Sequence, residues 1–188
     1  MMIVVIGGSA GALDAIHDIL SAIPEQHAAA FAIVVHISPT VESLLASVIG
    51  GYTPMPVREA VDTLPLQPGS VVVAPPDYHM LVERDLTIAL SRDGAEHFSR
   101  PAIDPLFDSA AASLGPKAIG VLLSGSNADG AKGLAALGAA GAKICVQDPE
   151  SASSPEMPRA GISAWKPDLV GTPTAIGRWI AQQVGGRR

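Results

Sequence analysis

The stretch VVIGGSAGALDAI, residues 4–16, contains an apolar run that ends in a glycine-rich turn. Beyond the turn, apolar residues recur at helical spacing, so the stretch predicts a buried strand, a tight turn and a helix. Short β-branched runs and helix-like segments alternate along most of the chain that follows. Nearly continuous apolar strands separated by helices are typical of parallel βαβ units. We therefore expect an α/β fold, a doubly wound three-layer α/β/α sandwich with a mostly parallel sheet.

The alternation is interrupted once, in the middle of the chain. Residues His79–Glu83 and Leu86–Ser91 flank a very short charged connection, which predicts an antiparallel hairpin. Further strands are expected at Met2–Ile6, Phe31–Val35, Pro56–Ala60, Gly69–Pro76, Ala118–Leu123 and Lys143–Gln147. Helices are expected at Gly11–Ala22, Val41–Ile49, Ile103–Leu114, Gly130–Ala140, Met157–Ser163 and Thr172–Val184. No interdomain linker or internal repeat is evident, so residues 1–188 are expected to form a single domain.

The composition excludes several classes of protein. Hydrophobic residues make up 48% of the chain and charged residues 16%, which excludes a disordered chain. A net charge of −6 argues against a nucleic-acid-binding protein. No lysine or arginine precedes Arg58 and no apolar run is long enough to cross a bilayer, so neither a secretory signal nor a membrane-embedded protein is predicted. The single cysteine, Cys145, reads as a buried strand residue, and a reducing cytoplasm is the expected location.

Ser9 stands at the tip of the first turn. Gly7–Gly8–Ser9–Ala10–Gly11 fits the G-x-S-x-G pattern of a nucleophile elbow, in which glycines leave room around an exposed serine. On the motif alone, an N-cap serine is the favoured interpretation, because the pattern is short. A phosphate-binding turn is a third interpretation, but Ile6 stands where G-x-G-x-x-G requires glycine.

Two further polar residues follow predicted strands. His36 ends the second strand, and Asp129 follows the strand Ala118–Leu123 after a short polar loop. The carboxyl ends of parallel strands meet at one edge of a doubly wound sheet, where ligands bind. A serine, a histidine and a carboxylate at that edge suit nucleophile, general base and orienting acid. The alternatives are a structural histidine and an N-cap aspartate.

The other histidines point to no metal site. His97 lies in polar surroundings and is expected to be solvated. His79 follows a double proline and is expected to be a turn residue, with a place at the border of the site as the alternative. Five scattered histidines and one cysteine show no metal-ligand spacing, so no metal is predicted.

At this point the chain resembles the catalytic domain of CheB-type chemotaxis protein-glutamate methylesterases. The resemblance covers nearly the whole chain and rests on seven blocks in order: VVIGGSAGALDAI, VVHISP, VVVAPPDYHM, SRPAIDPLFDSAA, VLLSGSNADGAKGL, VQDPESA and MPRAGI. It implies hydrolysis of γ-glutamyl methyl esters on the cytoplasmic helices of chemoreceptors, and in some members deamidation of glutamine. It also implies Ser9 as nucleophile, His36 as base and Asp129 as orienting acid, with no cofactor.

The blocks depart from the usual pattern at four positions. Ala10 stands where threonine is usual, Ala12 where glycine is usual, Ser126 where methionine is usual and Asn127 where glycine is usual. Backbone donors at Ala10 and Ser126 would survive such changes, and both residues are expected to border the oxyanion site. A weak or inactive receptor-binding module of the same fold is therefore the alternative.

The family's usual receiver domain has no counterpart before the first strand, since Met1 leads directly into it. We expect either a free-standing esterase, with a separate receiver-domain protein as the candidate regulator, or a fragment of a longer protein. The expected partners are methylated chemoreceptor helices.

Overall fold

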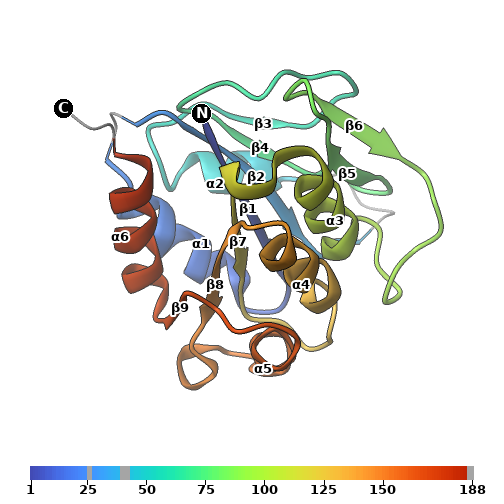
Figure 1. The fold of residues 1–188 in the computed structure, drawn as a ribbon. Coiled ribbons are helices and arrows are strands. Elements are labelled where there is room, and N and C mark those ends of the chain that lie inside the picture. The colour runs from blue at the N-terminus through green and yellow to red at the C-terminus, as the bar shows by residue number, and fades with distance from the viewer. Residues whose placement is uncertain (25–26, 39–42, 186–188) are drawn as a thin grey trace.

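The computed structural model describes residues 1–24, 27–38 and 43–185. Its centre is a parallel sheet of seven strands in the order β3-β4-β2-β1-β7-β8-β9 (Figure 1). The strands are β1 Met2–Gly8, β2 Ala29–Val35, β3 Val57–Glu59, β4 Val71–Val73, β7 Ala118–Leu122, β8 Lys143–Gln147 and β9 Leu169–Gly171. The predicted parallel sheet is thus confirmed.

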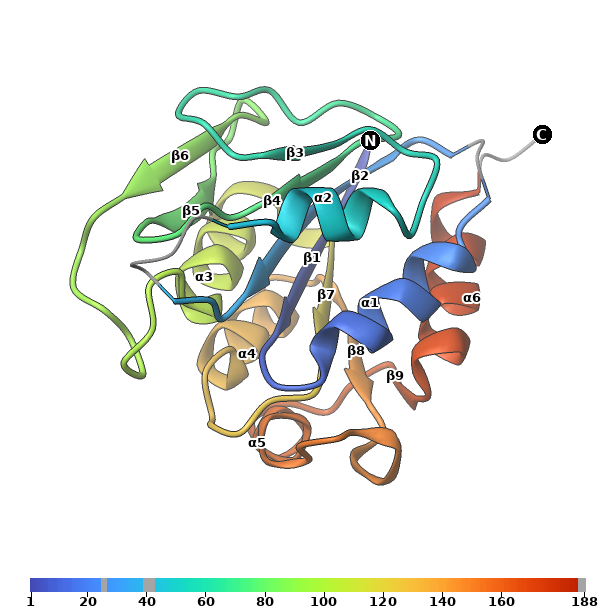
Figure 2. The ribbon, with the colours of Figure 1, turned by 180° about the vertical axis from the view of Figure 1, so that it is seen from behind.

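Helices cover both faces of this sheet, which confirms the three-layer sandwich. One face packs against α1 (Ala12–Ser21), α2 (Leu45–Gly50) and α6 (Pro173–Val184). Figure 2 shows α1 and α2 in front of the strands, with α6 beside α1. The other face packs against α3 (Ile103–Leu114), α4 (Ala131–Ala139) and α5 (Glu156–Ala164). Along β1, Val4 contributes to the first of these two cores and Val5 to the second. This alternation explains why the strand reads as a continuous apolar run.

The predicted hairpin forms from β5 (His79–Val82) and β6 (Ile88–Ser91), which pair antiparallel as a separate two-stranded sheet. Met80, Val82 and Ile88 are buried in the same core as Phe107 of α3. The hairpin therefore closes over one end of the α3 layer.

Most element boundaries shift by one or two residues from the predictions. The main omission is β9, whose three residues are partly buried or exposed and carry little periodic signal. Two short 3₁₀ turns, Gly115–Lys117 and Pro149–Ser151, were also not predicted. The second helix begins at Leu45 and not at residue 41, and positions 41–42 lie outside the described residues.

Two expectations from composition can be compared with the described part of the chain. Within it, no helix is long and apolar enough to cross a membrane. Cys145 is fully buried on β8, and this burial raises the pKa of its thiol far above the ordinary value. The interpretation of Cys145 as a buried strand residue is therefore confirmed.

The order of the strands determines where a ligand could bind. From the central β1 the chain first builds outward through β2 to β4 and β3, and later builds in the opposite direction through β7, β8 and β9. In open α/β sheets, this reversal leaves a crevice at the carboxyl ends of the strands on either side of it. Here this rule points to the edge where β1, β2 and β7 end.

Candidate active site

Ser9 follows β1 directly and lies between the ends of the two neighbouring strands. Its backbone N–H donates to the carbonyl of Ser124, after β7, at 2.8 Å. The N-cap of α1 is Gly11, with no side-chain cap, so the interpretation of Ser9 as an N-cap is wrong. Ser9 is half-buried, and among the described residues its hydroxyl makes no hydrogen bond. The hydroxyl is thus available for chemistry.

The sharp turn after Ser9 depends on glycine. Gly11 has a φ of 76°, in the left-handed region, and a Cβ there would lie 2.6 Å from the Cβ of Ser153. The segment after β8 therefore packs directly against the turn. Only glycine satisfies both the backbone angle and this close approach.

His36 and Asp129 form the central pair of the site. The Nε2 atom of His36 lies 2.7 Å from Oδ2 of Asp129, and the His36 side chain is only 10% exposed. The His36 backbone N–H donates to the carbonyl of Gly8 at 3.2 Å, which brings the histidine beside the Ser9 turn. Within the described residues, no hydrogen bond joins the Ser9 hydroxyl and the His36 ring. Such bonds often tighten only when substrate is bound.

Asp129 is completely buried and is stabilised by a helix other than its own. Its oxygens accept the backbone N–H groups of Ile103 at 2.7 Å and Asp104 at 3.0 Å, at the start of α3. The N-cap of α4 is Gly130, so the interpretation of Asp129 as the cap of the following helix is wrong. Burial by itself would raise the pKa of Asp129, but the hydrogen bonds from His36 and these two amides outweigh it and lower the pKa.

An ionised Asp129 determines the tautomer of His36. A carboxylate can only accept, so the Nε2 atom of His36 must carry the proton of their hydrogen bond. The Nδ1 atom of the neutral ring then carries no proton and has a free lone pair. His36 is thereby prepared to act as a base at Nδ1.

Two backbone N–H groups, in the loops that follow β1 and β7, are unpaired among the described residues. Among the described residues, the N–H groups of Ala10 and Ser126 have no hydrogen-bond acceptor. Both residues are exposed, and Ser124 connects their two loops, because its hydroxyl donates to the Ala10 carbonyl at 2.6 Å. Free, fixed N–H groups of this kind are what stabilises developing negative charge on a carbonyl oxygen.

Sequence reasoning missed the two residues that hold these loops. The Ser124 N–H donates to Oε1 of Gln147 at 2.9 Å, and Nε2 of Gln147 donates to the Ser151 carbonyl at 3.2 Å. Ser124 and Gln147 are both buried. Each lies at the end of a strand on the same edge as Ser9, and that placement is the signal that could have identified them.

A second polar cluster adjoins the Asp129 carboxylate. Side-chain ligand atoms of His97, Asp104 and Asp129 all lie within 4.8 Å of one another, a grouping that the sequence spacing did not predict. His97 is exposed, as expected, and its Nε2 lies 3.8 Å from Oδ2 of Asp104. Burial, followed by the nearby charge of Asp129, raises the pKa of Asp104 although the Gly133 N–H opposes the shift. Asp129 already accepts three hydrogen bonds, which limits its capacity as a metal ligand.

Comparison with known proteins shows a consistent family relationship. The family described as CheB methylesterase matches residues 4–180. A relative from Leptospira interrogans, provisionally named protein-glutamate methylesterase/protein-glutamine glutaminase, is 38% identical over 167 residues, covering 89% of this chain and 86% of its own. A relative from Anaeromyxobacter dehalogenans, named protein-glutamate methylesterase/protein-glutamine glutaminase 3, is 38% identical over 180 residues, covering 95% of this chain and 53% of its own.

The fold agrees with a solved structure of the same kind. The crystal structure of the Thermotoga maritima CheB methylesterase catalytic domain matches with a TM-score of 0.92 at 28% identity. The match covers 97% of this chain and 98% of that one.

Proposed function

Because the chain belongs to the CheB methylesterase family, we propose that it is a serine hydrolase that removes methyl esters from glutamate side chains of chemoreceptors. Glutamine side-chain amides are the second substrate class. The observation that carries the proposal is the buried 2.7 Å contact between His36 and Asp129 beside an uncommitted serine hydroxyl. The reaction needs no cofactor, and its protein substrate places it in the cytoplasm.

In the proposed mechanism Ser9 is the nucleophile. As its Oγ attacks the ester carbonyl, His36 takes the hydroxyl proton at Nδ1 and Asp129 stabilises the resulting imidazolium. The N–H groups of Ala10 and Ser126 hold the oxyanion. Methanol leaves with the proton from His36, and water, deprotonated by the same ring, hydrolyses the acyl-enzyme to release glutamate and restore Ser9.

A non-catalytic binding module is the second candidate. It is favoured by the missing hydrogen bond between Ser9 and His36 and by the unusual residues Ala10, Ser126 and Asn127. A dinucleotide or phosphate site is less compatible with the geometry, because the Ser9 N–H is already used by the Ser124 carbonyl. A separate receiver-domain protein remains the candidate regulator of the esterase.

Covalent labelling of the purified protein with a fluorophosphonate separates the two candidates. We expect stoichiometric labelling of the wild type and none of Ser9→Ala or His36→Ala, with far-UV circular dichroism showing that all three are folded. Labelling of the wild type at the rate of the variants would favour the binding module. Retained ester hydrolysis by Ser9→Ala would exclude the mechanism.

A further inference from the structure

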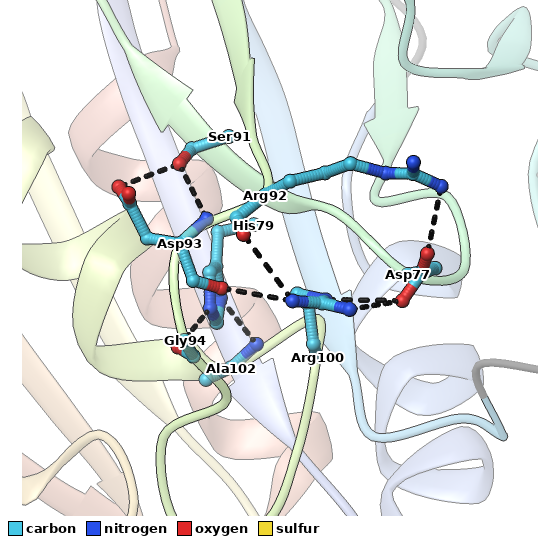
Figure 3. Close-up of polar contacts among 8 residues, drawn as sticks. All are labelled: Asp77, His79, Ser91, Arg92, Asp93, Gly94, Arg100 and Ala102. Carbon is cyan, nitrogen blue, oxygen red and sulfur yellow. Dashed lines mark hydrogen bonds and ion pairs between the residues drawn. The ribbon is translucent and has the colours of Figure 1, made fainter.

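The connection between β6 and α3, residues 92–102, forms an arm whose base is held by charged side chains (Figure 3). The guanidinium of Arg100 donates to Asp77 Oδ1 through Nε at 3.0 Å and to the Asp93 carbonyl through Nη1 at 3.0 Å. Arg92 donates to the other oxygen of Asp77 at 2.8 Å. One carboxylate therefore ties together both ends of the arm.

A buried histidine fixes the same base from the inside. His79 is 1% exposed, and its Nδ1 accepts the N–H of Ala102 at 3.2 Å while its Nε2 donates to the Gly94 carbonyl at 3.0 Å. Figure 3 shows the imidazole between these two backbone groups. The expectation of a simple turn residue at His79 is wrong: its ring orients the arm.

The tip of the arm has an unfavourable backbone and an unburied aromatic ring. Glu96 and Ser99 exchange two backbone hydrogen bonds, of 3.1 and 2.8 Å, around a two-residue turn. His97 and Phe98 in that turn have φ angles of 48° and 63°, in the left-handed region that asparagine and glycine prefer. Phe98 is fully exposed, at 104%. Such strain persists where the surroundings enforce it, and it concentrates at functional sites.

The tip lies beside the proposed catalytic pair. The His97 ring nitrogen is within 4.8 Å of a carboxylate oxygen of Asp129, which contacts His36 at 2.7 Å. Next to His36 in the chain, Ile37 lines an open apolar hollow of about 360 Å³ together with the 71% exposed Leu44. Exposed apolar groups thus adjoin the site both at the arm and beyond His36.

We propose that Phe98 is a substrate-docking residue that packs against apolar side chains of the α-helix carrying the glutamyl ester. The inference deepens the proposed function and rests on it for the identity of the ester. A helix entering this site presents its ester on one face, and residues three and four positions away lie on the same face. An aromatic ring on a rigid arm is a suitable anchor for those residues, because little conformational freedom is lost on contact.

Synthetic helical peptides provide the test. One peptide carries a single glutamate γ-methyl ester with leucines three and four residues to each side, and its matched control carries serines there. The enzyme variants are wild type, Phe98→Asn, Phe98→Ala and Val170→Ala, the last removing a 43% exposed apolar side chain on β9. Because asparagine favours the left-handed turn, Phe98→Asn is expected to fold with an unchanged or higher Tm.

For the leucine peptide, we expect Phe98→Asn and Phe98→Ala to raise KM about tenfold, or about 1.4 kcal/mol, with kcat little changed. Fluorophosphonate labelling and hydrolysis of p-nitrophenyl acetate should stay at wild-type rates, since neither reagent reaches Phe98. Val170→Ala should leave the KM for the leucine peptide at its wild-type value. For the serine peptide, the Phe98 variants should have the same KM as the wild type. Wild-type KM values for Phe98→Asn on the leucine peptide would overturn the inference.

Binding of the leucine peptide to Ser9→Ala, with and without Phe98→Asn and measured by fluorescence anisotropy, separates this inference from the proposed function. Binding that weakens about tenfold with Phe98→Asn, without any hydrolysis by the wild type, would support docking and refute the esterase. If the peptide is hydrolysed, and neither its hydrolysis nor its binding changes on substitution of Phe98, the result would support the esterase and refute docking. A leucine peptide that does not bind at all would overturn the docking role.

Discussion

Replacing Asp129 by asparagine tests the proposed site most directly, because the two side chains have the same shape. The carboxylate accepts three hydrogen bonds: from His36 and Ile103 at Oδ2, and from Asp104 at Oδ1. An amide has one oxygen and one NH₂ group, so its NH₂ must face at least one backbone N–H in either orientation. No rotation of the side chain restores the three native bonds.

The rate should fall because the His36 tautomer is no longer controlled. If the asparagine NH₂ occupies the Oδ2 position, His36 Nε2 must accept and the proton moves to Nδ1, which removes the base. If the oxygen occupies that position, the tautomer survives but the charge that stabilises the imidazolium is lost. We expect Asp129→Asn to lower the fluorophosphonate labelling rate on the order of 10³–10⁴-fold.

The stability should fall as well, because Asp129 is 0% exposed. At least one buried N–H loses its acceptor, at about 1–3 kcal/mol, and the remaining bonds lose their ionic character. Together these changes predict a loss of about 3–5 kcal/mol in the free energy of unfolding. This exceeds the typical effect of a point substitution and is a sizeable fraction of the stability of an average domain.

Labelling kinetics and urea unfolding of the same preparations measure both effects. Labelling is carried out at a temperature where circular dichroism shows the variant folded, and His36→Ala serves as the control that removes the base but leaves both α3 amides bonded to Asp129. An Asp129→Asn variant that labels within tenfold of wild type and loses less than about 0.5 kcal/mol would refute the assigned role of Asp129.

Three further predictions concern the same edge of the sheet. Folding lowers the pKa of Asp129 below its unfolded value of about 3.9. The stabilisation of the fold by the ionised Asp129 carboxylate should therefore be complete above about pH 4 and be lost as the pH falls through the folded-state pKa. In urea titrations, the difference in free energy of unfolding between wild type and Asp129→Asn should accordingly shrink below about pH 4. Gly11→Ala should lower the free energy of unfolding by about 1–3 kcal/mol and slow fluorophosphonate labelling, because its Cβ would lie 2.6 Å from Ser153 and its φ is 76°. A urea midpoint equal to that of the wild type would contradict this. Gln147→Leu leaves the buried Ser124 N–H without its 2.9 Å acceptor. It should lower the free energy of unfolding by about 1–3 kcal/mol and slow fluorophosphonate labelling about tenfold. The control Gln182→Leu, at an exposed position, should change neither the free energy of unfolding nor the labelling rate.

The arm at residues 92–102 illustrates what local sequence does not reveal. SRDGAEHFSR reads as a polar loop, and nothing in it indicates a turn with two non-glycine residues at positive φ. The arm is shaped by Asp77, which lies just before the hairpin, and by His79, the first residue of the hairpin. These contacts depend on how β5, β6 and α3 pack, so no sequence window contains them.

Residue patterns alone were enough to predict the alternation of strands and helices and the edge at which Ser9, His36 and Asp129 would meet. Apolar periodicity is a local property, and the carboxyl ends of parallel strands share one edge whatever their order. The contacts that hold the site together depend instead on how distant segments pack. Placing β1 between β2 and β7 joins Ser9 to Ser124, and docking α3 against that edge gives its free N–H groups to Asp129. Those contacts connect residues 25 or more positions apart, so they arise from packing of the whole chain and not from any pattern within one segment.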